Sequence, residues 1–446
     1  MGRLFGTDGV RGTANTQLTP ELAYRLGRAA TFLFGQEHER PIIIIGRDTR
    51  ISGPMLEAAL AAGICSAGGQ AILTGVVPTP AVAYLTRKLQ AQAGVVISAS
   101  HNPYPDNGIK FFAGTGYKLP DAVEDQLEEL VLSVEDNLPR PTGQALGTIS
   151  HRPELLVDYV NFVADIVSAD FSGLKVVVDC SHGAAYEVAP RLLKQLGAEV
   201  IVINAQPTGC NINDNCGSTH LAGLQQTVLE HKADIGIAHD GDADRCLAVD
   251  EQGQIIDGDQ IMVMCALNLM KQGKLKDNTL VTTVMSNIGL HQAIKAAGGN
   301  VIVTPVGDRY VLEAMAENGY VLGGEQSGHI IFLDYNTTGD GVLTALELIA
   351  AVKQSGKKLS QMGALMTRYP QLLMNVRLKS KEGWDSNSAI AAAIAAGEEK
   401  LGDNGRILVR PSGTEPLIRV MAEGPCQQEL EQIVSQIADV IKGELD

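Results

Sequence analysis

The apolar residues of this chain recur in a unit that appears three times. In each unit an apolar run is followed by a polar turn, a helical stretch, a glycine break and a second apolar run. The first apolar runs span residues 41–45, 175–179 and 279–284. The helical stretches end at Ala67, Leu196 and Ala297. The second apolar runs span residues 68–73, 197–203 and 298–304. Because the runs are continuous instead of alternating, they are typical of strands buried on both faces of a mostly parallel sheet. The pattern predicts three similar α/β domains in tandem, with mostly parallel mixed sheets.

The pattern changes beyond Tyr369. The remaining segments read as a strand, an Ala-rich helix, two strands and a closing helix, at residues 375–379, 386–401, 406–410, 417–422 and 427–445. They predict a smaller C-terminal α+β domain. Placing the joints near residues 141–153, 250–258 and 369 divides the chain into predicted domains 1–152, 153–253, 254–367 and 368–446.

Composition narrows the class of protein. The 446 residues are 45% hydrophobic and 19% charged, which is globular and far from disordered composition. The 35 Lys and Arg against 51 Asp and Glu give a net charge of −16, which argues against nucleic-acid and membrane partners. Seven scattered cysteines without CxxC spacing argue against structural zinc and disulfides. With no signal-peptide core and no apolar run near about 18 residues, we expect a cytoplasmic protein.

The most informative segment holds three aspartates at alternate positions, Asp240, Asp242 and Asp244, between two apolar runs. Three carboxylates in one turn repel one another strongly unless a hard cation lies among them. A ligand set without His or Cys favours Mg²⁺ over Zn²⁺. The turn is not an EF-hand, because the sixth position from Asp240 is Arg245 instead of glycine. The alternative is a solvated acidic turn, which the flanking apolar runs disfavour.

A second segment places serines at the end of an apolar run, with His101 and Lys110 following. Hydroxyls at the carboxyl end of a strand are well placed for covalent chemistry in α/β sheets. A serine in such a place is also a common helix cap or turn residue. Ser98 and Ser100 could share a strand face, so their spacing does not identify the nucleophile.

Three further loops carry weaker signals. Backbone N–H groups, hydroxyls and guanidinium groups meet in the turn that holds Arg410, Ser412, Gly413, Thr414 and Arg419. This combination suits a phosphate dianion, although a tight turn with solvated arginines is the alternative. A glycine-flanked loop carries Glu325, Ser327 and His329, whose side chains can bind sugar hydroxyls. The alternative is an ordinary polar loop of similar composition. The loop with Asp8 and Arg11 is similarly suggestive.

Taken together, the loops resemble those of the α-D-phosphohexomutase family. Such proteins carry a serine loop, an Asp-Gly-Asp-x-Asp-Arg loop, a Gly-Glu-x-Ser-Gly-His loop and an Arg-x-Ser-Gly-Thr-Glu-Pro loop, and the resemblance spans the chain from Gly6 to the last helix. Gln326 is typical of the branch that acts on glucosamine phosphates, since the mannose and glucose branch usually carries Met there. One departure is Ala243, where many relatives have glycine. We expect a Cβ to be tolerated there if φ is negative.

The resemblance implies a role for each candidate residue. Ser100 would be a phosphoserine and, with Asp240, Asp242 and Asp244, would hold one Mg²⁺ per chain beside Arg245. Glu325 and Ser327 would bind sugar hydroxyls, with Arg309 lending charge. The phosphate that is not transferred would be held by Arg410, Ser412, Gly413, Thr414 and Arg419. Proton transfer and charge stabilisation would fall to Arg11, His101, Lys110 and His329, and spacing does not choose between Lys110 and His329 as general base.

The implied reaction interconverts glucosamine 6-phosphate and glucosamine 1-phosphate and feeds synthesis of UDP-N-acetylglucosamine and cell-wall precursors. Phosphoserine 100 would give its phosphoryl group to the sugar, and the resulting 1,6-bisphosphate would return its other phosphate. Glucosamine or glucose 1,6-bisphosphate would act as intermediate and activator. We expect a monomer or homodimer with a central cleft, closed by movement about residues 367–371. The alternatives are the same chemistry on glucose or mannose phosphates, a metal-dependent phosphatase, and a non-catalytic sugar-phosphate sensor.

Overall fold

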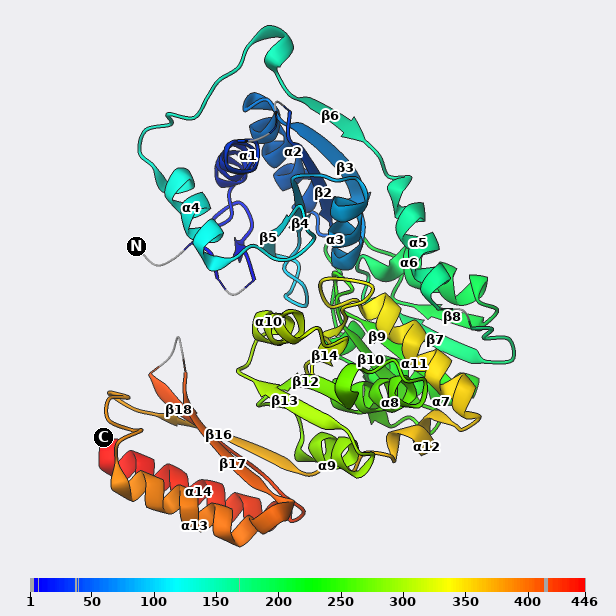
Figure 1. The fold of residues 1–446 in the computed structure, drawn as a ribbon, viewed down its shortest axis with the longest axis vertical. Helices are drawn as coiled ribbons and strands as arrows, with labels where there is room; N and C mark the ends of the chain where they lie inside the picture. The colour runs from blue at the N-terminus through cyan, green and yellow to red at the C-terminus, as the bar shows by residue number, and fades with distance from the viewer. Residues whose placement is uncertain are drawn as a thin grey trace. The chain divides into compact units, whose positions relative to one another are not determined.

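The computed structural model describes residues 4–6, 8–36, 38, 40–167, 169–412 and 416–445. They contain four sheets, of six, five, four and three strands (Figure 1). The chain divides into two compact units, and each is described by itself. The first unit comprises Met1–Val284 and Val301–Ala364, and the second comprises Met285–Asn300 and Leu365–Asp446.

The first sheet has the order β1-β5-β4-β2-β3-β6. Its strands are β1 (Val10–Thr13), β2 (Ile42–Arg47), β3 (Gln70–Val76), β4 (Ala93–Ile97), β5 (Asp106–Ala113) and β6 (Thr148–His151). Strands β2, β3, β4 and β6 are parallel, whereas β5 and β1 run antiparallel to their neighbours. The helices of this segment are α1 (Pro20–Phe34), α2 (Gly53–Ser66), α3 (Thr79–Lys88) and α4 (Asp121–Leu132), with a 3₁₀ turn at Gly143–Ala145. The serine loop follows β4 at the carboxyl end of the parallel strands.

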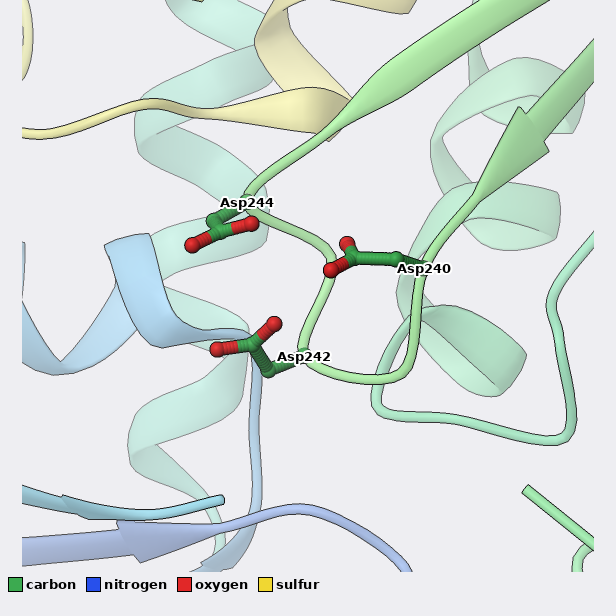
Figure 2. A group of neighbouring side chains, drawn as sticks. All are labelled: Asp240, Asp242 and Asp244. Atoms are coloured by element: carbon green, nitrogen blue, oxygen red, sulfur yellow. The ribbon is translucent and has the colours of Figure 1, made fainter. Parts of the chain in front are cut away.

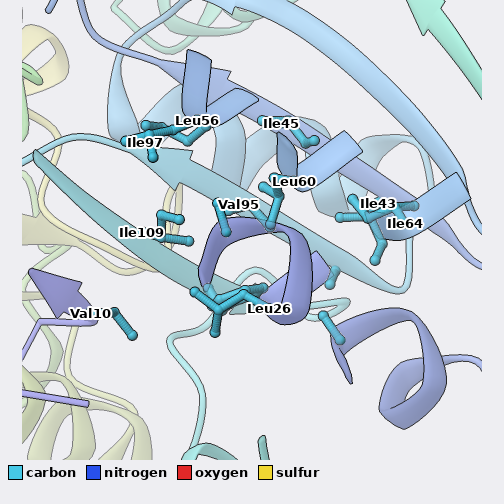
Figure 3. Packing of buried hydrophobic residues seen from close by; sticks show 14 of the residues in the cluster. Val10, Leu26, Ile43, Ile45, Leu56, Leu60, Ile64, Val95, Ile97 and Ile109 are labelled. Carbon is cyan, nitrogen blue, oxygen red and sulfur yellow. The ribbon is translucent and has the colours of Figure 1, made fainter. Parts of the chain in front are cut away.

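The core of this sheet explains its layers. Alternate residues of β2 and β4, Ile43, Ile45, Val95 and Ile97, pack against α1 and α2 (Figure 3). The residues between them face α3, and Gly46 and Gly94 leave room there for its Val82. The strands are therefore buried on both faces, as their continuous apolar runs predict.

The second sheet has the order β11-β10-β9-β7-β8. Its strands are β7 (Lys175–Asp179), β8 (Glu199–Ile203), β9 (Ile235–His239), β10 (Cys246–Asp250) and β11 (Ile255–Ile256), with helices α5 (Leu155–Ile166), α6 (Ala185–Gln195) and α7 (Ala222–His231) and a 3₁₀ turn at Gly217–Thr219. Strands β7, β8 and β9 are parallel, and β10 returns antiparallel to β9. The turn between β9 and β10 carries the three aspartates.

The third sheet has the order β13-β12-β14-β15. Its strands are β12 (Thr279–Thr283), β13 (Asn300–Thr304), β14 (Leu322–Gly324) and β15 (Ile330–Phe332), and the helices are α8 (Gly258–Lys271), α10 (Asp308–Asn318), α11 (Gly341–Ser355) and α12 (Leu359–Gly363), with a 3₁₀ turn at Lys276–Asn278. A capping box of Asp257 and Gln260 starts α8. The β14–β15 turn carries the predicted sugar loop.

The second unit is built on the antiparallel sheet β16-β18-β17. Its elements are β16 (Gln371–Arg377), β17 (Arg406–Pro411), β18 (Leu417–Glu423), α9 (Ile288–Ala296), α13 (Ser388–Leu401) and α14 (Gln427–Leu445), with a 3₁₀ turn at Gly402–Asn404. Ile418 and Val420 of β18 pack against Ile433 and Ile437 of α14. The helices α13 and α14 therefore cover one face of this sheet (Figure 1).

The predicted fold class is confirmed, with three α/β segments followed by a smaller α+β one. The first predicted run of each repeat is a strand, namely β2, β7 and β12. The domain boundaries stay a prediction. Among the described residues, no helix combines the length and the apolar character needed to span a lipid bilayer.

Candidate functional site

The turn between β9 and β10 gathers the three aspartates into one buried group. Asp240, Asp242 and Asp244 each offer an oxygen within 4.8 Å of the others, and their carboxylates point toward a common space (Figure 2). Asp242 Oδ1 and Asp244 Oδ1 are buried without a hydrogen-bond partner among the described residues. Unsatisfied carboxylate oxygens of this kind suit a hard cation such as Mg²⁺. The predicted acidic triad is thus a group that could bind a metal.

Cationic side chains surround this group. Lys110 Nζ lies 3.0 Å from Asp242 Oδ2 and 2.8 Å from Asp8 Oδ2, and it is buried. Burial works against the charged amine, but the carboxylates of Asp242, Asp8 and Asp244 outweigh it and raise the pKa of Lys110. Burial raises the pKa of Asp240, and the like charges of Asp244 and Asp242 raise it further. The aspartates are therefore only partly neutralised by the protein's own cations.

His329 contacts the triad from the β14–β15 turn. Its Nδ1 lies 3.5 Å from Asp244 Oδ2 and its Nε2 lies 3.4 Å from Asp308 Oδ2. Burial lowers the pKa of His329, but these two carboxylates outweigh it and raise the pKa to about 9. The Gly339 N–H donates to Nε2 at 3.1 Å, and that contact requires an unprotonated nitrogen. The hydrogen bond therefore favours a neutral ring that directs an Nδ1 proton at Asp244, in opposition to the carboxylates.

The structure separates the two serines that spacing could not. Ser100 Oγ donates to Asp240 Oδ2 at 2.6 Å, whereas Ser98 Oγ donates to Asp48 Oδ2 at 2.5 Å. Both side chains are buried. Of the two hydroxyls, only that of Ser100 faces the triad.

A cavity of about 680 Å³ lies beside the triad within the first unit. The polar side chains that line it come from loops of the first three sheets. They include Asp8, Arg11, His101, Lys118, Asp244, Arg245, Asp308, Glu325 and His329. Glu325 Oε1 accepts from the Gly307 N–H at 3.2 Å, and Ser327 Oγ is buried without a partner among the described residues. Burial lowers the pKa of His101, helped by Arg245 and Arg11. The cavity joins four carboxylates, two imidazoles, two guanidinium groups and an ammonium group around a space large enough for a sugar phosphate.

Arg309 lies elsewhere. Its guanidinium forms ion pairs with Asp121 and Glu124 at the start of α4, and it donates to the Leu119 carbonyl at 3.2 Å. It is not among the residues that line the cavity. In this structure Arg309 joins α10 to α4. Its role in placing positive charge near the sugar stays a prediction.

In the second unit, Arg410 and Arg419 lie directly opposite each other on β17 and β18. Burial lowers the pKa of Arg410, and Arg419 lowers it further. Like charges opposed across a sheet are unfavourable unless an anion lies between them. Ser412 is buried, and Lys381 donates to its carbonyl at 2.6 Å. Gly413 and Thr414 lie outside the described residues.

Several residues at the site were missed from the sequence. Thr79 donates to Asp242 Oδ2 at 2.6 Å from the start of α3. Lys118 links Asp8 and Asp308 at 2.8 and 2.5 Å. The proline pair that flanks Thr79 was the available signal, and Asp8 was already named with Arg11 in the glycine-rich loop near the start of the chain. Nothing in the spacing marks Lys118 or Asp308.

The expectation for Ala243 is wrong in its premise. Its φ is +58°, and the residue is fully buried. A Cβ in the left-handed region is strained, and a glycine at this position would avoid that strain. The chain carries that strain inside the aspartate turn.

Comparison with known proteins places this geometry in a family. Models of the phosphoglucomutase/phosphomannomutase family match in chain order: alpha/beta/alpha domain I over residues 2–137, domain II over 157–253, domain III over 257–369 and the C-terminal domain over 373–440. The chain is 57% identical to the phosphoglucosamine mutase of Heliobacterium modesticaldum, covering 99% of this chain and all of that protein. It is 56% identical to the phosphoglucosamine mutase of Brevibacillus brevis over the full length of both.

Solved structures give the same fold. A phosphoglucomutase/phosphomannomutase family protein from Burkholderia thailandensis superposes with a TM-score of 0.83 at 23% identity, over 99% of this chain and 97% of that one. The N-acetylphosphoglucosamine mutase of Aspergillus fumigatus, solved with GlcNAc-6P and magnesium, gives a TM-score of 0.72 at 17% identity, over 99% and 96%. On the family models and the full-length relatives, the chain belongs to the phosphoglucomutase/phosphomannomutase family, as its four loops predict.

Proposed function

We propose that this protein is an isomerase that interconverts glucosamine 6-phosphate and glucosamine 1-phosphate, the phosphoglucosamine mutase reaction. The substrate class follows from the full-length relatives, which are phosphoglucosamine mutases at 55–57% identity. The chemistry rests on one observation, the 2.6 Å contact between Ser100 Oγ and Asp240 at a buried carboxylate triad. A nucleophilic hydroxyl beside a candidate cation site is the arrangement that phosphoryl transfer to and from serine requires.

The aspartates fit Mg²⁺ as the cofactor. Asp240, Asp242 and Asp244 supply oxygen ligands only, and two of those oxygens have no hydrogen-bond partner within the described part of the chain. Ser100 would complete the set with its own or its phosphate's oxygen. Mg²⁺ held there would supply positive charge beside the phosphoryl group during transfer. We infer one such ion per chain.

The chain's own residues then have separate roles in the transfer of the phosphoryl group. The free hydroxyl of the sugar phosphate attacks the phosphorus of phosphoserine 100, so a bond to the sugar oxygen forms while the bond to Ser100 Oγ breaks. The hydroxyl proton passes to His329 in its neutral form, because the charged ammonium of Lys110 has no lone pair to accept it. Ser100 Oγ leaves as an alkoxide and takes up a proton, which restores the hydroxyl that donates to Asp240. Arg11 and Arg245 place positive charge at the same cavity, and His101, whose pKa is lowered, lines it as a neutral imidazole. Catalysis of this kind depends on positioning and electrostatic stabilisation.

Binding of the sugar is proposed for the cavity of the first unit. Glu325 and Ser327 are proposed to hold sugar hydroxyls, and Arg309 stays a prediction as a helper. The phosphate that is not transferred is proposed to bind Arg410, Ser412 and Arg419, together with Gly413 and Thr414. The 1,6-bisphosphate formed in the first transfer reorients, and its second phosphoryl group returns to Ser100.

A three-substrate assay tests the proposal. Isomerisation of glucosamine 6-phosphate should exceed that of glucose and mannose 6-phosphates at equal enzyme. Equal or faster turnover of mannose 6-phosphate would contradict the glucosamine assignment. Free phosphate released as fast as the isomer forms would favour the phosphatase alternative.

Labelling identifies the nucleophile. Incubation with ³²P-labelled hexose 1,6-bisphosphate should label the wild type on the peptide that contains Ser100. Ser100→Ala should take up no label and should lose at least about 10³-fold in kcat, because the covalent step is removed. Ser98→Ala is the matched variant, since its buried hydroxyl points at Asp48, and it should still take up label. Label retained in Ser100→Ala would refute the covalent role.

A further inference from the structure

The serine loop is held by a buried arginine that touches neither the triad nor the cavity. Arg50 is fully buried, and its guanidinium donates to three backbone carbonyls of the loop. Nη2 donates to the Ser100 carbonyl at 2.8 Å and to the Asn102 carbonyl at 2.9 Å. Nη1 donates to the carbonyls of Asn102 and Pro103, each at 3.0 Å. The planar fork of an arginine therefore fixes the path of residues 100–103.

Asp48 connects Arg50 to the backbone N–H of Ser100 by way of the Ser98 hydroxyl. Its Oδ2 lies 3.0 Å from Arg50 Nε, and its Oδ1 accepts from the Arg50 N–H at 2.9 Å. The same carboxylate accepts from Ser98 Oγ at 2.5 Å, and Ser98 Oγ in turn accepts from the Ser100 N–H at 3.0 Å. The amide and the carbonyl of Ser100 are thus both held by one network anchored on Asp48.

A second donor reaches the same carbonyls from the neighbouring sheet's loops. Asn213, in the connection after β8, donates through Nδ2 to the carbonyls of Ser100 at 2.9 Å and Asn102 at 3.1 Å. Its own backbone N–H donates to the Ser181 carbonyl at 2.9 Å. The Ser100 carbonyl therefore receives one donor from each of two segments that are far apart in sequence.

This hydrogen-bond network holds Ser100 in a strained backbone conformation. The φ of Ser100 is +52°, a left-handed conformation that costs a residue with a Cβ about 1–2 kcal/mol. Multiple charge-assisted hydrogen bonds are strong enough to offset that cost. In this conformation Ser100 Oγ points at Asp240. A serine that relaxed to negative φ would turn its Oγ and lose that alignment.

We propose that Arg50 and Asn213 are positioning residues for phosphoryl transfer: together they hold Ser100 in the strained conformation that aims its hydroxyl at the triad. This inference rests on the proposed function. Neither side chain contacts the reacting atoms, so both act through the loop backbone. A displacement of about 1 Å at a reacting group can cost about 100-fold in rate, which sets the expected scale.

Conservative variants with matched controls test it. Arg50→Lys keeps the charge beside Asp48 but has three donors in place of the planar fork that makes four hydrogen bonds to the loop. Asn213→Asp keeps the shape but loses the donor. Both should lower kcat about 100-fold while KM for glucosamine 6-phosphate changes less than threefold. Arg28→Lys is the control for the first, because Arg28 is equally buried and bonds Asp136, Ser66 and the Leu138 carbonyl away from the serine loop. Asn215→Asp is the control for the second, because Asn215 is exposed and also has positive φ.

Hydrogen exchange of the peptide spanning residues 97–104 gives a readout that does not need activity. Exchange should quicken at least tenfold in Arg50→Lys and Asn213→Asp and stay unchanged in both controls. Unchanged kcat with unchanged exchange would overturn the inference, as would equal losses in the controls. If the wild type isomerises no hexosamine phosphate, the proposed function fails, and exchange alone then decides whether the loop is held as inferred. Circular dichroism identifies a variant that does not fold, in which case the other variant decides.

Discussion

The buried triad predicts that removing one negative charge stabilises the protein when no divalent cation is present. Asp240→Asn is the sharpest version, because Asn keeps the acceptor for the Arg245 N–H and a polar partner for Ser100 Oγ. Two like charges about 5 Å apart repel by about 3 kcal/mol at an effective dielectric constant of about 20. Asp240 has two such neighbours within 4.8 Å, and Arg245 offsets about one of them.

An independent bound comes from protonation. The pKa of Asp240 is raised above its ordinary 3.8 by burial and by the other aspartates, so the side chain can escape repulsion by binding a proton. At pH 7 the cost of that proton is at most about 4 kcal/mol, at 1.36 kcal/mol per pKa unit. The repulsion estimate of about 3 kcal/mol lies below this bound, so we expect Asp240→Asn to gain about 3 kcal/mol in the metal-free protein.

Asp242→Asn is the matched variant with the opposite expectation. It removes the same charge, but it also takes from buried Lys110 a partner at 3.0 Å. Losing one member of a buried ion pair costs about 3–5 kcal/mol, which cancels the relief of repulsion. We therefore expect Asp240→Asn to unfold later than Asp242→Asn in EDTA.

Thermal unfolding at pH 7.5, with EDTA and then with saturating Mg²⁺, measures both effects. The wild type should gain about 2.7 kcal/mol at a Mg²⁺ concentration 100 times Kd, whereas Asp240→Asn should gain far less. The reasoning is refuted if Asp240→Asn is less stable than the wild type in EDTA, or if Mg²⁺ stabilises the two proteins equally.

Three further predictions concern backbone contact, phosphate binding and acid stability. Gly241→Ala places a Cβ 2.6 Å from the Ser100 carbonyl oxygen, so we expect a loss of about 1–3 kcal/mol in urea unfolding and a lower kcat; Gly223→Ala, with open space around it, should cause neither. Arg419→Gln should raise KM for glucosamine 6-phosphate about 10-fold or more with kcat nearly unchanged, and an unaltered KM would remove Arg419 from phosphate binding. Burial and Arg406 lower the pKa of His291 to about 4, so stability should fall by about 3 kcal/mol as the pH drops from about 6.5 to 4. His291→Asn should lose that dependence, and an identical pH profile in the variant would contradict it.

Much of the fold could be predicted because strands that are buried on both faces require continuous runs of apolar residues in the sequence. Strands β2, β7 and β12 are buried on both faces, and their continuous apolar runs identify them. Strand β1, by contrast, is only four residues long and half polar, and it pairs with β5 through long-range contacts that no local pattern encodes. Its place at the edge of the first sheet had to come from the structure.

The site divides in the same way. Asp240, Asp242 and Asp244 were predictable because three carboxylates in one turn are costly without a cation, and the structure buries them together. The choice between Ser98 and Ser100 was not, because it depends on Asp48, fifty residues away, which takes up one of the hydroxyls. Hydrogen bonds between distant segments decide such cases, and a single sequence does not display them.

The division of the chain into two units has a consequence for recombining this protein with its relatives. Helix α9 belongs to the second unit although its neighbours β12 and β13 belong almost entirely to the first, so the polypeptide passes between the units three times. Asn287, at the start of α9, donates to the Tyr369 carbonyl at 2.9 Å and accepts from the Tyr369 N–H at 3.1 Å. A chimera that exchanged only the last 80 or so residues would pair a foreign segment with the native α9. Transplanting residues 285–300 along with 365–446 would keep that packing intact.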